Sequence, residues 1–71
     1  MTYDYSKLKG RMKEKELTQE DVAKHIDKDK STLNLKLNNQ SYFVQDEIFK
    51  IVNLLEIPAE EIKEYFFNEK V

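Results

Sequence analysis

Apolar residues recur along this chain at the spacing of helices, and polar stretches divide them into short segments. From residue 5 to about residue 15, Tyr5, Leu8 and Met12 fall at i, i+3 and i+7, which predicts an amphipathic helix. Residues 1–4 carry no such pattern, and we expect them to be a loose lead-in. The first predicted helix therefore has one side for the core and one for solvent.

The outer side of this predicted helix is basic. Its members are Lys7, Lys9, Arg11, Lys13 and Lys15. A solvated face is the simpler interpretation of these charges, and contact with a DNA backbone is the functional one. Gly10 lies inside the same helix, where it costs about 1 kcal/mol relative to Ala. A close crossing of a second helix at Gly10 would justify that cost.

Residues 18–38 predict two short helices joined by a polar turn. Thr18 can accept a hydrogen bond from the backbone N–H three residues on, where Asp21 occupies the reciprocal position, so a helix starts here. The apolar stripe of that helix consists of Val22, Ala23 and Ile26. The small Ala23 suits a close crossing of two helices. Residues 27–30 contain no apolar side chain and end the stripe.

The second helix of this pair is predicted over about residues 30–37. Asp29 is a suitable N-cap, and Leu33 and Leu37 recur at i, i+4 along its buried edge. The far side, about 100–200° around the helix from Leu33, carries Ser31, Asn34, Leu35 and Asn38. Two helices with one buried edge and one polar edge are the layout of a DNA-binding helix-turn-helix.

The clearest helical pattern lies in the second half, where four apolar residues follow the spacing i, i+3, i+4, i+7. These are Ile48, Ile51, Val52 and Leu55. Phe49 and Leu54 widen this face, so we expect the helix to be central to the core. Pro58 suits the first position of a last helix. The apolar side of that last helix consists of Ile62, Tyr65 and Phe66.

Five helices are thus predicted, with no internal repeat and no linker. One Gly and one Pro leave few of the turns that a β-fold requires. We therefore expect an all-α fold in one domain spanning residues 1–71. Its central helix-turn-helix would cover about residues 18–38.

The charges are unevenly placed along the chain. The net charge is −2, which argues against a strong nonspecific DNA binder. Residues 1–41 contain nine Lys and Arg and seven Asp and Glu, whereas residues 42–71 contain three and seven. Only the N-terminal half is therefore suited to face phosphate.

The inventory of reactive side chains argues against an enzyme. The chain has no Cys, so His25, the single His, cannot complete a zinc set or a Cys–His pair, and we expect an ordinary surface histidine. Asp27 opens a pattern like that of a calcium loop, but Thr32 stands where that loop needs Gly. We expect no metal, no cofactor and no small-molecule substrate.

The chain also lacks the patterns of a membrane or secreted protein. No apolar run approaches the ~20 residues of a membrane span. The start, MTYDYSKLKG, lacks the apolar core of a signal peptide. The simplest expectation is a location in the cytoplasm of a bacterial host cell.

The predicted recognition surface lies on the helix pair. Gln19 opens the first of the two helices, where backbone N–H groups and the helix dipole suit a phosphate. Lys30, Ser31 and Asn34 are side-chain types that reach base edges in the major groove. Lys36, on the same predicted helix, completes the predicted DNA-binding set.

Leu35 is the exception among these polar residues. As an exposed apolar side chain it can contact a thymine methyl group. It can equally belong to a protein-binding patch or pack at the edge of its helix. Leu35 and the net charge favour a protein partner, whereas the polar residues of the predicted helix favour DNA.

The sequence resembles a known family over nearly its whole length. TQEDVAKHI and STLNLKLNN are similar to the helix-turn-helix of the phage Cro/CI-type repressors, with Gln19 first, Ala23 buried, and paired Leu residues in the second helix. YSKLKGRM and EIFKIVNLLEIPAEEIKEYFF extend the resemblance to a group of small prophage Cro-like regulators. The family has Gly in the turn where this chain has Asp27, which can take a left-handed conformation at some strain.

The resemblance implies a λ-repressor-like bundle of five helices in which the second and third helices read DNA. It places Gln19 on a backbone phosphate and the exposed residues of helix three at base-reading positions, Lys30, Ser31, Asn34 and Leu35. Such proteins act as dimers on paired half-sites. The residues that match the dimer contact near the last helix are Tyr65, Phe66 and Phe67.

Two functional hypotheses follow. The first is a sequence-specific transcriptional regulator of a temperate-phage switch, which binds double-stranded operator DNA as a homodimer. The alternative is a modulator or antirepressor of the modulator-of-repression type, which forms a heteromer with a phage repressor protein and binds DNA weakly or not at all. An antitoxin is less favoured, since no extra segment is present to clasp a toxin.

Overall fold

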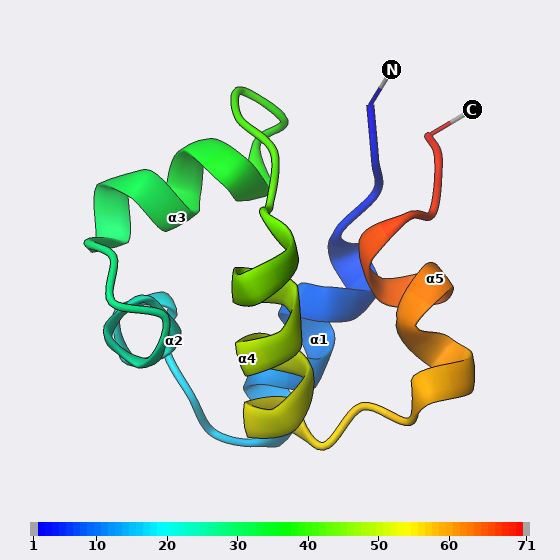
Figure 1. The fold of residues 1–71 in the computed structure, drawn as a ribbon, viewed down its shortest axis with the longest axis horizontal. Coiled ribbons are helices and arrows are strands. Elements are labelled where there is room, and N and C mark those ends of the chain that lie inside the picture. The colour runs from blue at the N-terminus through cyan, green and yellow to red at the C-terminus, as the bar shows by residue number, and fades with distance from the viewer. Residues whose placement is uncertain (1, 71) are drawn as a thin grey trace.

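The computed structural model describes residues 2–70, which form five α-helices and one short 3₁₀ helix around one hydrophobic core (Figure 1). In chain order the elements are α1 (Ser6–Glu14), α2 (Gln19–His25), α3 (Lys30–Leu37), α4 (Gln45–Leu55), η1 (Ala59–Glu61) and α5 (Ile62–Phe66). No β-strand forms within residues 2–70. The predicted all-α fold of five helices is confirmed.

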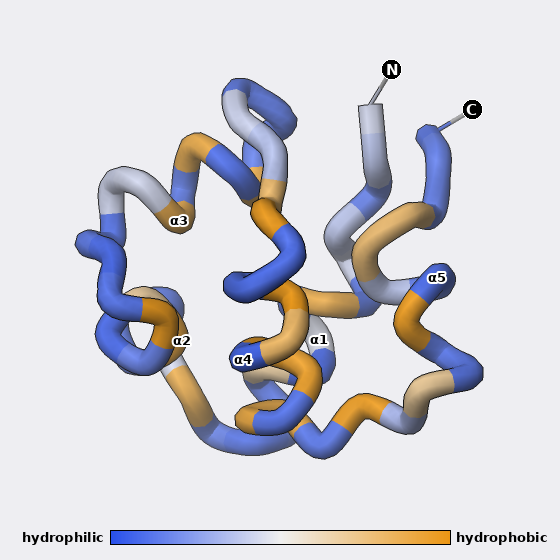
Figure 2. Tube along the Cα trace, viewed as in Figure 1, coloured by the Kyte–Doolittle hydropathy of each residue, from blue (hydrophilic) through white to orange (hydrophobic). Residues whose placement is uncertain are grey.

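The helices are arranged on two sides of α1 and α4. In Figure 1, α4 lies in front of α1, the α2–α3 pair occupies one side, and α5 the other. Helix α2 contacts both α3 and α4, and α5 contacts α1. Figure 2 shows the hydrophobic positions of α2 on the side that faces α4. No helix within residues 2–70 is long and apolar enough to cross a membrane.

The core is made by the apolar stripes that the sequence predicted, with one exception on α4. Ile51 and Leu55 are buried, and Ile48 and Val52 are half-buried. Phe49 is 65% exposed, so the expectation that it widens the buried face is wrong. At 100° per residue, Phe49 lies about 110° from the centre of the α4 stripe, beyond the edge that neighbouring helices cover.

The close helix crossing expected at Gly10 is absent from the described residues. A Cβ atom built on Gly10 would have no heavy atom within 4 Å, so no helix crosses closely there. Ala23, the small residue expected at a helix crossing, is buried on α2, which contacts both α3 and α4.

The expectation of a loose lead-in is wrong for residues 2–4, and residue 1 lies outside the described residues. The backbone of Tyr3 forms an antiparallel bridge with Glu69, and the Asp4 N–H donates to the carbonyl of Asn68 at 2.7 Å. On its other side, Tyr3 exchanges two hydrogen bonds with the Asn39 side-chain amide, at 2.8 and 2.9 Å. Because these backbone groups are satisfied, the lead-in is part of the fold.

Four helices end at a non-glycine residue with a left-handed backbone. These are Glu16 (φ 58°), Asp27 (φ 59°), Asn39 (φ 63°) and Glu56 (φ 53°). After α2, the N–H of Lys28 donates to the carbonyl of Ala23 at 2.9 Å, which is the hydrogen bond of a Schellman ending. Asp27 therefore adopts the conformation that the turn between α2 and α3 requires, as predicted.

A left-handed Glu is strained, so Glu16→Gly should stabilise the protein. Relief of the Cβ clash outweighs the greater freedom of Gly in the unfolded chain, and we expect the free energy of unfolding to rise by about 0.5–1 kcal/mol. Urea unfolding followed by circular dichroism measures this. Lys13→Gly, inside α1, is the control and should lower it by about 1 kcal/mol. A loss of stability in Glu16→Gly would contradict the assignment of strain.

The helix starts predicted at Thr18 and Asp29 are confirmed, whereas Pro58 precedes the 3₁₀ helix η1 and the last α-helix begins only at Ile62. Thr18 and Asp21 form a complete capping box, and the Thr32 N–H donates to the Asp29 carboxylate at 2.8 Å. The Thr18 backbone N–H and hydroxyl both donate to Asp21 Oδ2 at 2.9 Å. These hydrogen bonds, the backbone one first, lower the pKa of Asp21 below its ordinary value of 3.8.

The lowered pKa of Asp21 makes the capping box sensitive to acid. A depressed carboxyl pKa contributes stability that is present above pH 3.8 and is lost as the pH falls through the folded-state value. Asp21→Asn removes this titration, so its unfolding free energy should fall less steeply in acid than that of the wild type. Urea unfolding at a series of pH values compares the two slopes, and parallel curves would refute the assignment.

Candidate functional site

The exposed face of α3 carries most of the predicted DNA-binding residues. Lys30, Ser31 and Asn34 are exposed, and Leu35 is 46% exposed. The Asn34 Oδ1 accepts a hydrogen bond from the side-chain amide of Asn38 at 2.6 Å. Gln19 is half-buried at the start of α2. The structure thus brings a polar face with one apolar residue to the surface, as the sequence predicted.

Lys36 does not belong to this face. It is only 6% exposed, and its Nζ lies 2.6 Å from Glu47 Oε1, so its assignment to the DNA-binding set is wrong. The helical wheel contains the signal, because Lys36 is about 60° from the buried Leu33 and on the opposite side from Asn34. Lys36 was assigned to the exposed face only because lysine is usually a surface residue.

The Lys36–Glu47 ion pair joins three segments. Lys36 Nζ also donates to the carbonyl of Tyr42 at 3.1 Å, and Glu47 Oε1 also accepts from the Val44 N–H at 3.0 Å. Glu47 Oε2 is buried without a hydrogen-bond partner. The pair therefore ties α3 and α4 to the loop over residues 38–44 that connects them.

Removing one partner of this pair should be far more costly than removing both charges. Lys36→Met leaves the Glu47 carboxylate charged and buried, and we expect it to lower the free energy of unfolding by about 3–5 kcal/mol. In the double variant with Glu47→Gln, the amide oxygen can still accept from the Val44 N–H and no charge is buried. Most of the lost stability should return in urea unfolding. A double variant no more stable than Lys36→Met would contradict this reading of the pair.

The expected dimer contact at the last helix is largely inside the molecule. Tyr65 and Phe66 are buried core residues, so their assignment to a partner interface is wrong. They belong to the same stripe as Ile62, and that stripe packs within one chain. Phe67 is exposed on one side and meets the ring of Tyr3 edge-on, with centroids 5.9 Å apart. The partner contact expected at Phe67 stays a prediction.

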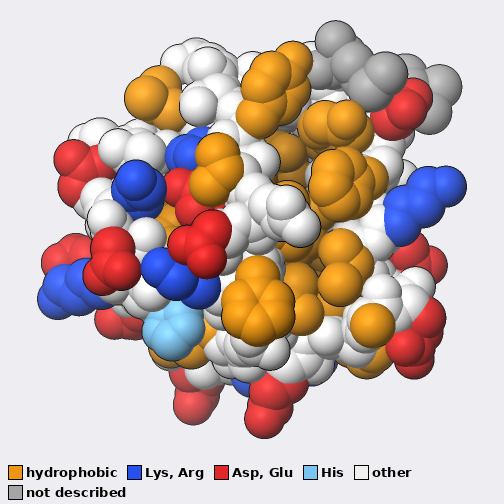
Figure 3. Space-filling view, in the orientation of Figure 1, with side chains coloured by type: hydrophobic (Ala, Val, Ile, Leu, Met, Phe, Trp, Pro, Cys, Tyr) orange, Lys and Arg blue, Asp and Glu red, His pale blue; other side chains and the backbone are white. Residues whose placement is uncertain are grey.

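An apolar band that the sequence did not predict lies on α4 and the loop before it. Tyr42 is 69% exposed, Val44 53% and Phe49 65%. We call these three residues the apolar band. Figure 3 shows hydrophobic side chains gathered on this face, over α4 and between α4 and α5. Half-buried Phe43, Ile48 and Val52 continue the apolar surface inward.

The edge of the apolar band is polar and carries one lysine between two aspartates. Lys50 Nζ lies 3.2 Å from Asp46 and 3.5 Å from Asp27. The Asp46 hydrogen bond is the main cause of the raised pKa of Lys50. Val44 and Phe49 line a shallow hollow together with Gln45 and Asp46. Exposed apolar residues beside paired charges are the composition of a protein interface, with an apolar centre and a polar rim.

Sequence reasoning missed the band because its residues follow no single period. Tyr42 and Val44 lie in a loop, where periodicity carries no information about exposure. The only available signal was the position of Phe49 outside the α4 stripe.

Within residues 2–70, no group of three or more His, Asp or Glu is placed to hold a metal ion.

The sequence was compared with known protein families and with proteins of curated function. The profile of a family described as "Protein of unknown function (DUF739)" matches residues 1–69. No protein of curated function matches the sequence.

Similarity to a solved structure extends along the whole chain. That structure is the solution structure of the modulator of repression (MOR) of the temperate bacteriophage TP901-1 from Lactococcus lactis. The two sequences are 44% identical, the match covers 100% of this chain and 96% of that one, and the TM-score is 0.78. The predicted resemblance to small phage regulators, including the modulator-of-repression type, is thereby confirmed. This chain belongs to the DUF739 family and shares its fold with a phage modulator of repression.

Proposed function

We propose that this protein is a modulator of repression that binds a phage repressor protein. The observation that carries the proposal is its full-length similarity to the TP901-1 modulator, at 44% identity. A protein of this kind acts in the cytoplasm of the bacterial host, where the phage operators lie. The alternative hypothesis from the sequence is thus favoured over direct reading of operator DNA.

The surface chemistry supports a protein partner. Tyr and Phe are enriched in the centres of protein interfaces, where charged residues are depleted. The apolar band exposes one of each, Tyr42 and Phe49, beside Val44. Phosphate-binding surfaces depend instead on Lys and Arg. On α3, Lys36 is buried and is therefore not part of the exposed face. We therefore place the repressor on the apolar band.

The band is held in shape before a partner arrives. Lys36 and Glu47 fix the backbone at Tyr42 and Val44, on either side of Phe43. The ring of Phe43 packs edge-on against Tyr5 and Phe66, at centroid distances of 5.4 and 5.5 Å. A preorganised loop loses less conformational entropy on binding, which leaves more of the contact energy for affinity.

Substitutions on the two faces distinguish which one binds the repressor. Phe49→Ser should lower affinity for the repressor of the genome that carries this gene by about 2 kcal/mol or more, because a large aromatic leaves the centre of the interface. Asn34→Ala, on the α3 face, is the matched surface control and should leave affinity unchanged. Calorimetric titration measures both, with circular dichroism to confirm folding. The opposite pattern would move the interface to α3, and no binding by the wild type would refute the proposed function.

Direct DNA binding is the second candidate, favoured by the exposure of Lys30, Ser31 and Asn34 on one face of α3. In this reading Gln19 contacts phosphate and Leu35 a thymine methyl group. Selection from random duplex DNA, with a salt series, tests it on the protein alone. An enriched palindromic site whose affinity falls with salt would establish a DNA reader. Weak binding without enrichment would leave repressor binding as the function.

A further inference from the structure

Gly10 is the only glycine in the chain, and nothing within the fold requires it. Its backbone is helical and does not have a positive φ. A Cβ at this position would meet no atom within 4 Å. Glycine inside a helix destabilises it relative to alanine. The absence of a side chain therefore has no intramolecular explanation among the described residues, which points to something that approaches from outside.

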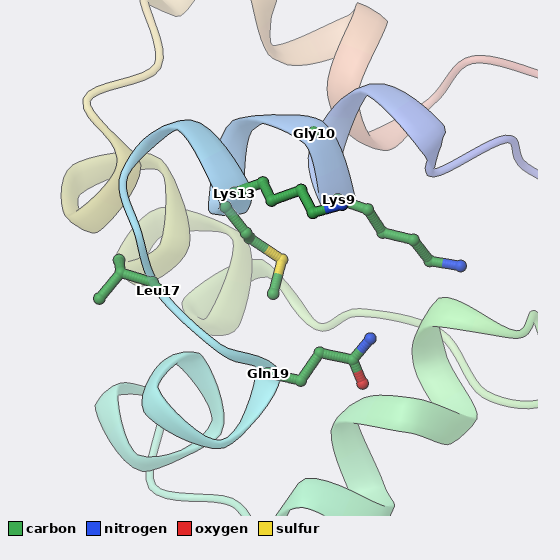
Figure 4. Close-up of a pocket in the computed structure, with 6 residues that line it drawn as sticks. Lys9, Gly10, Lys13, Leu17 and Gln19 are labelled. Carbon is green, nitrogen blue, oxygen red and sulfur yellow. The ribbon is translucent and has the colours of Figure 1, made fainter.

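Gly10 lines a hollow of about 400 Å³ between α1 and the start of α2. The residues around it are Lys9, Gly10, Met12, Lys13, Leu17 and Gln19. Met12 contributes apolar surface to its lining, Leu17 borders it with its side chain directed away from Gln19 (Figure 4), and Lys9, Lys13 and Gln19 contribute polar ends. Figure 4 shows the long side chains of Lys9 and Lys13 leaving α1 on the side toward Gln19.

The two lysines of this hollow differ from the other basic residues of α1 and its C-cap. The others are engaged inside the molecule: Lys7 with Glu64, Arg11 with the carbonyls of Leu55 and Glu56, and Lys15 with the Glu56 carboxylate. Lys9 and Lys13 are exposed and have no ion-pair partner within residues 2–70. The hollow therefore combines an apolar lining with two available positive charges.

We propose that this hollow is a docking site for an acidic amphipathic segment of another protein. An aliphatic or aromatic side chain of that segment contacts the apolar lining at Met12, and its carboxylates pair with Lys9 and Lys13. Gly10 lets the partner's backbone approach α1 closely. The site shares no residue with the apolar band, and the proposal does not rest on repressor binding.

A nucleic-acid backbone fits this hollow less well. Phosphate oxygens would bind the lysines and Gln19, but they gain nothing from contact with the apolar side chains of Met12 and Leu17. A bare glycine is also unnecessary for phosphate contact by long lysine side chains, which reach outward from the helix. Charge and apolar surface together therefore favour an acidic peptide over DNA.

The test is selection of a displayed library of random 16-residue peptides on the full chain. We expect enriched peptides with Asp or Glu flanking an apolar residue, and peptide-induced NMR shifts at the amides of Lys9, Gly10, Lys13 and Gln19. Gly10→Ala should bind these peptides at least tenfold more weakly while melting at a higher temperature than the wild type. Lys9→Ala with Lys13→Ala should also weaken binding, and Glu14→Ala on the same helix is the control.

Several results would overturn the proposal. Enriched peptides that bind Gly10→Ala as tightly as the wild type would show that the glycine serves no approach. Enrichment of basic peptides, or of none, would remove the acidic partner. A duplex DNA that shifts the same amides and displaces the selected peptides at physiological salt would assign the hollow to nucleic acid instead.

Discussion

The buried ion pair between Lys36 and Glu47 holds together α3, α4 and the loop that connects them. Two opposite charges lie 2.6 Å apart in the interior, one from α3 and one from the first turn of α4. Burying charges is costly unless they are paired and hydrogen-bonded, and the backbone at Tyr42 and Val44 adds one hydrogen bond to each side chain while Glu47 Oε2 has no partner. The same contact thus sets the angle between two helices and the path of the loop that joins them.

The loop is also held from the other side, by aromatic rings and the chain ends. Phe43 packs edge-on between Tyr5 and Phe66, and Tyr3 packs against Phe67. The Asn39 side chain binds the backbone of Tyr3, next to the bridge with Glu69. Segments from both ends of the sequence therefore support a loop in its middle. The exposed Tyr42 and Val44 project from a fixed backbone, which suits an interface better than a mobile loop would.

The lysines of the molecule differ in whether they pair with carboxylates, a difference that the net charge does not show. Lys36, in the interior, and Lys50, at the edge of the apolar band, are both paired with carboxylates, so that face offers mainly apolar contact. Lys9 and Lys13 on α1 have no such partners within the described residues. Two faces with different chemistry on one small domain are suited to two partners, or to two parts of one partner.

The local pattern of side chains was enough to predict the first four helices and the starts at Thr18 and Asp29, because these depend on residues a few positions apart. The left-handed turn at Asp27 was expected from the family resemblance. The local pattern also identified the exposed face of α3, since Leu33 and Leu37 define the opposite edge. The burial of Lys36, the core positions of Tyr65 and Phe66 and the exposure of Phe49 became evident only from the packed fold. A helical period gives each side chain an angle about its own axis, but whether that angle meets solvent or another helix depends on neighbours brought together by folding.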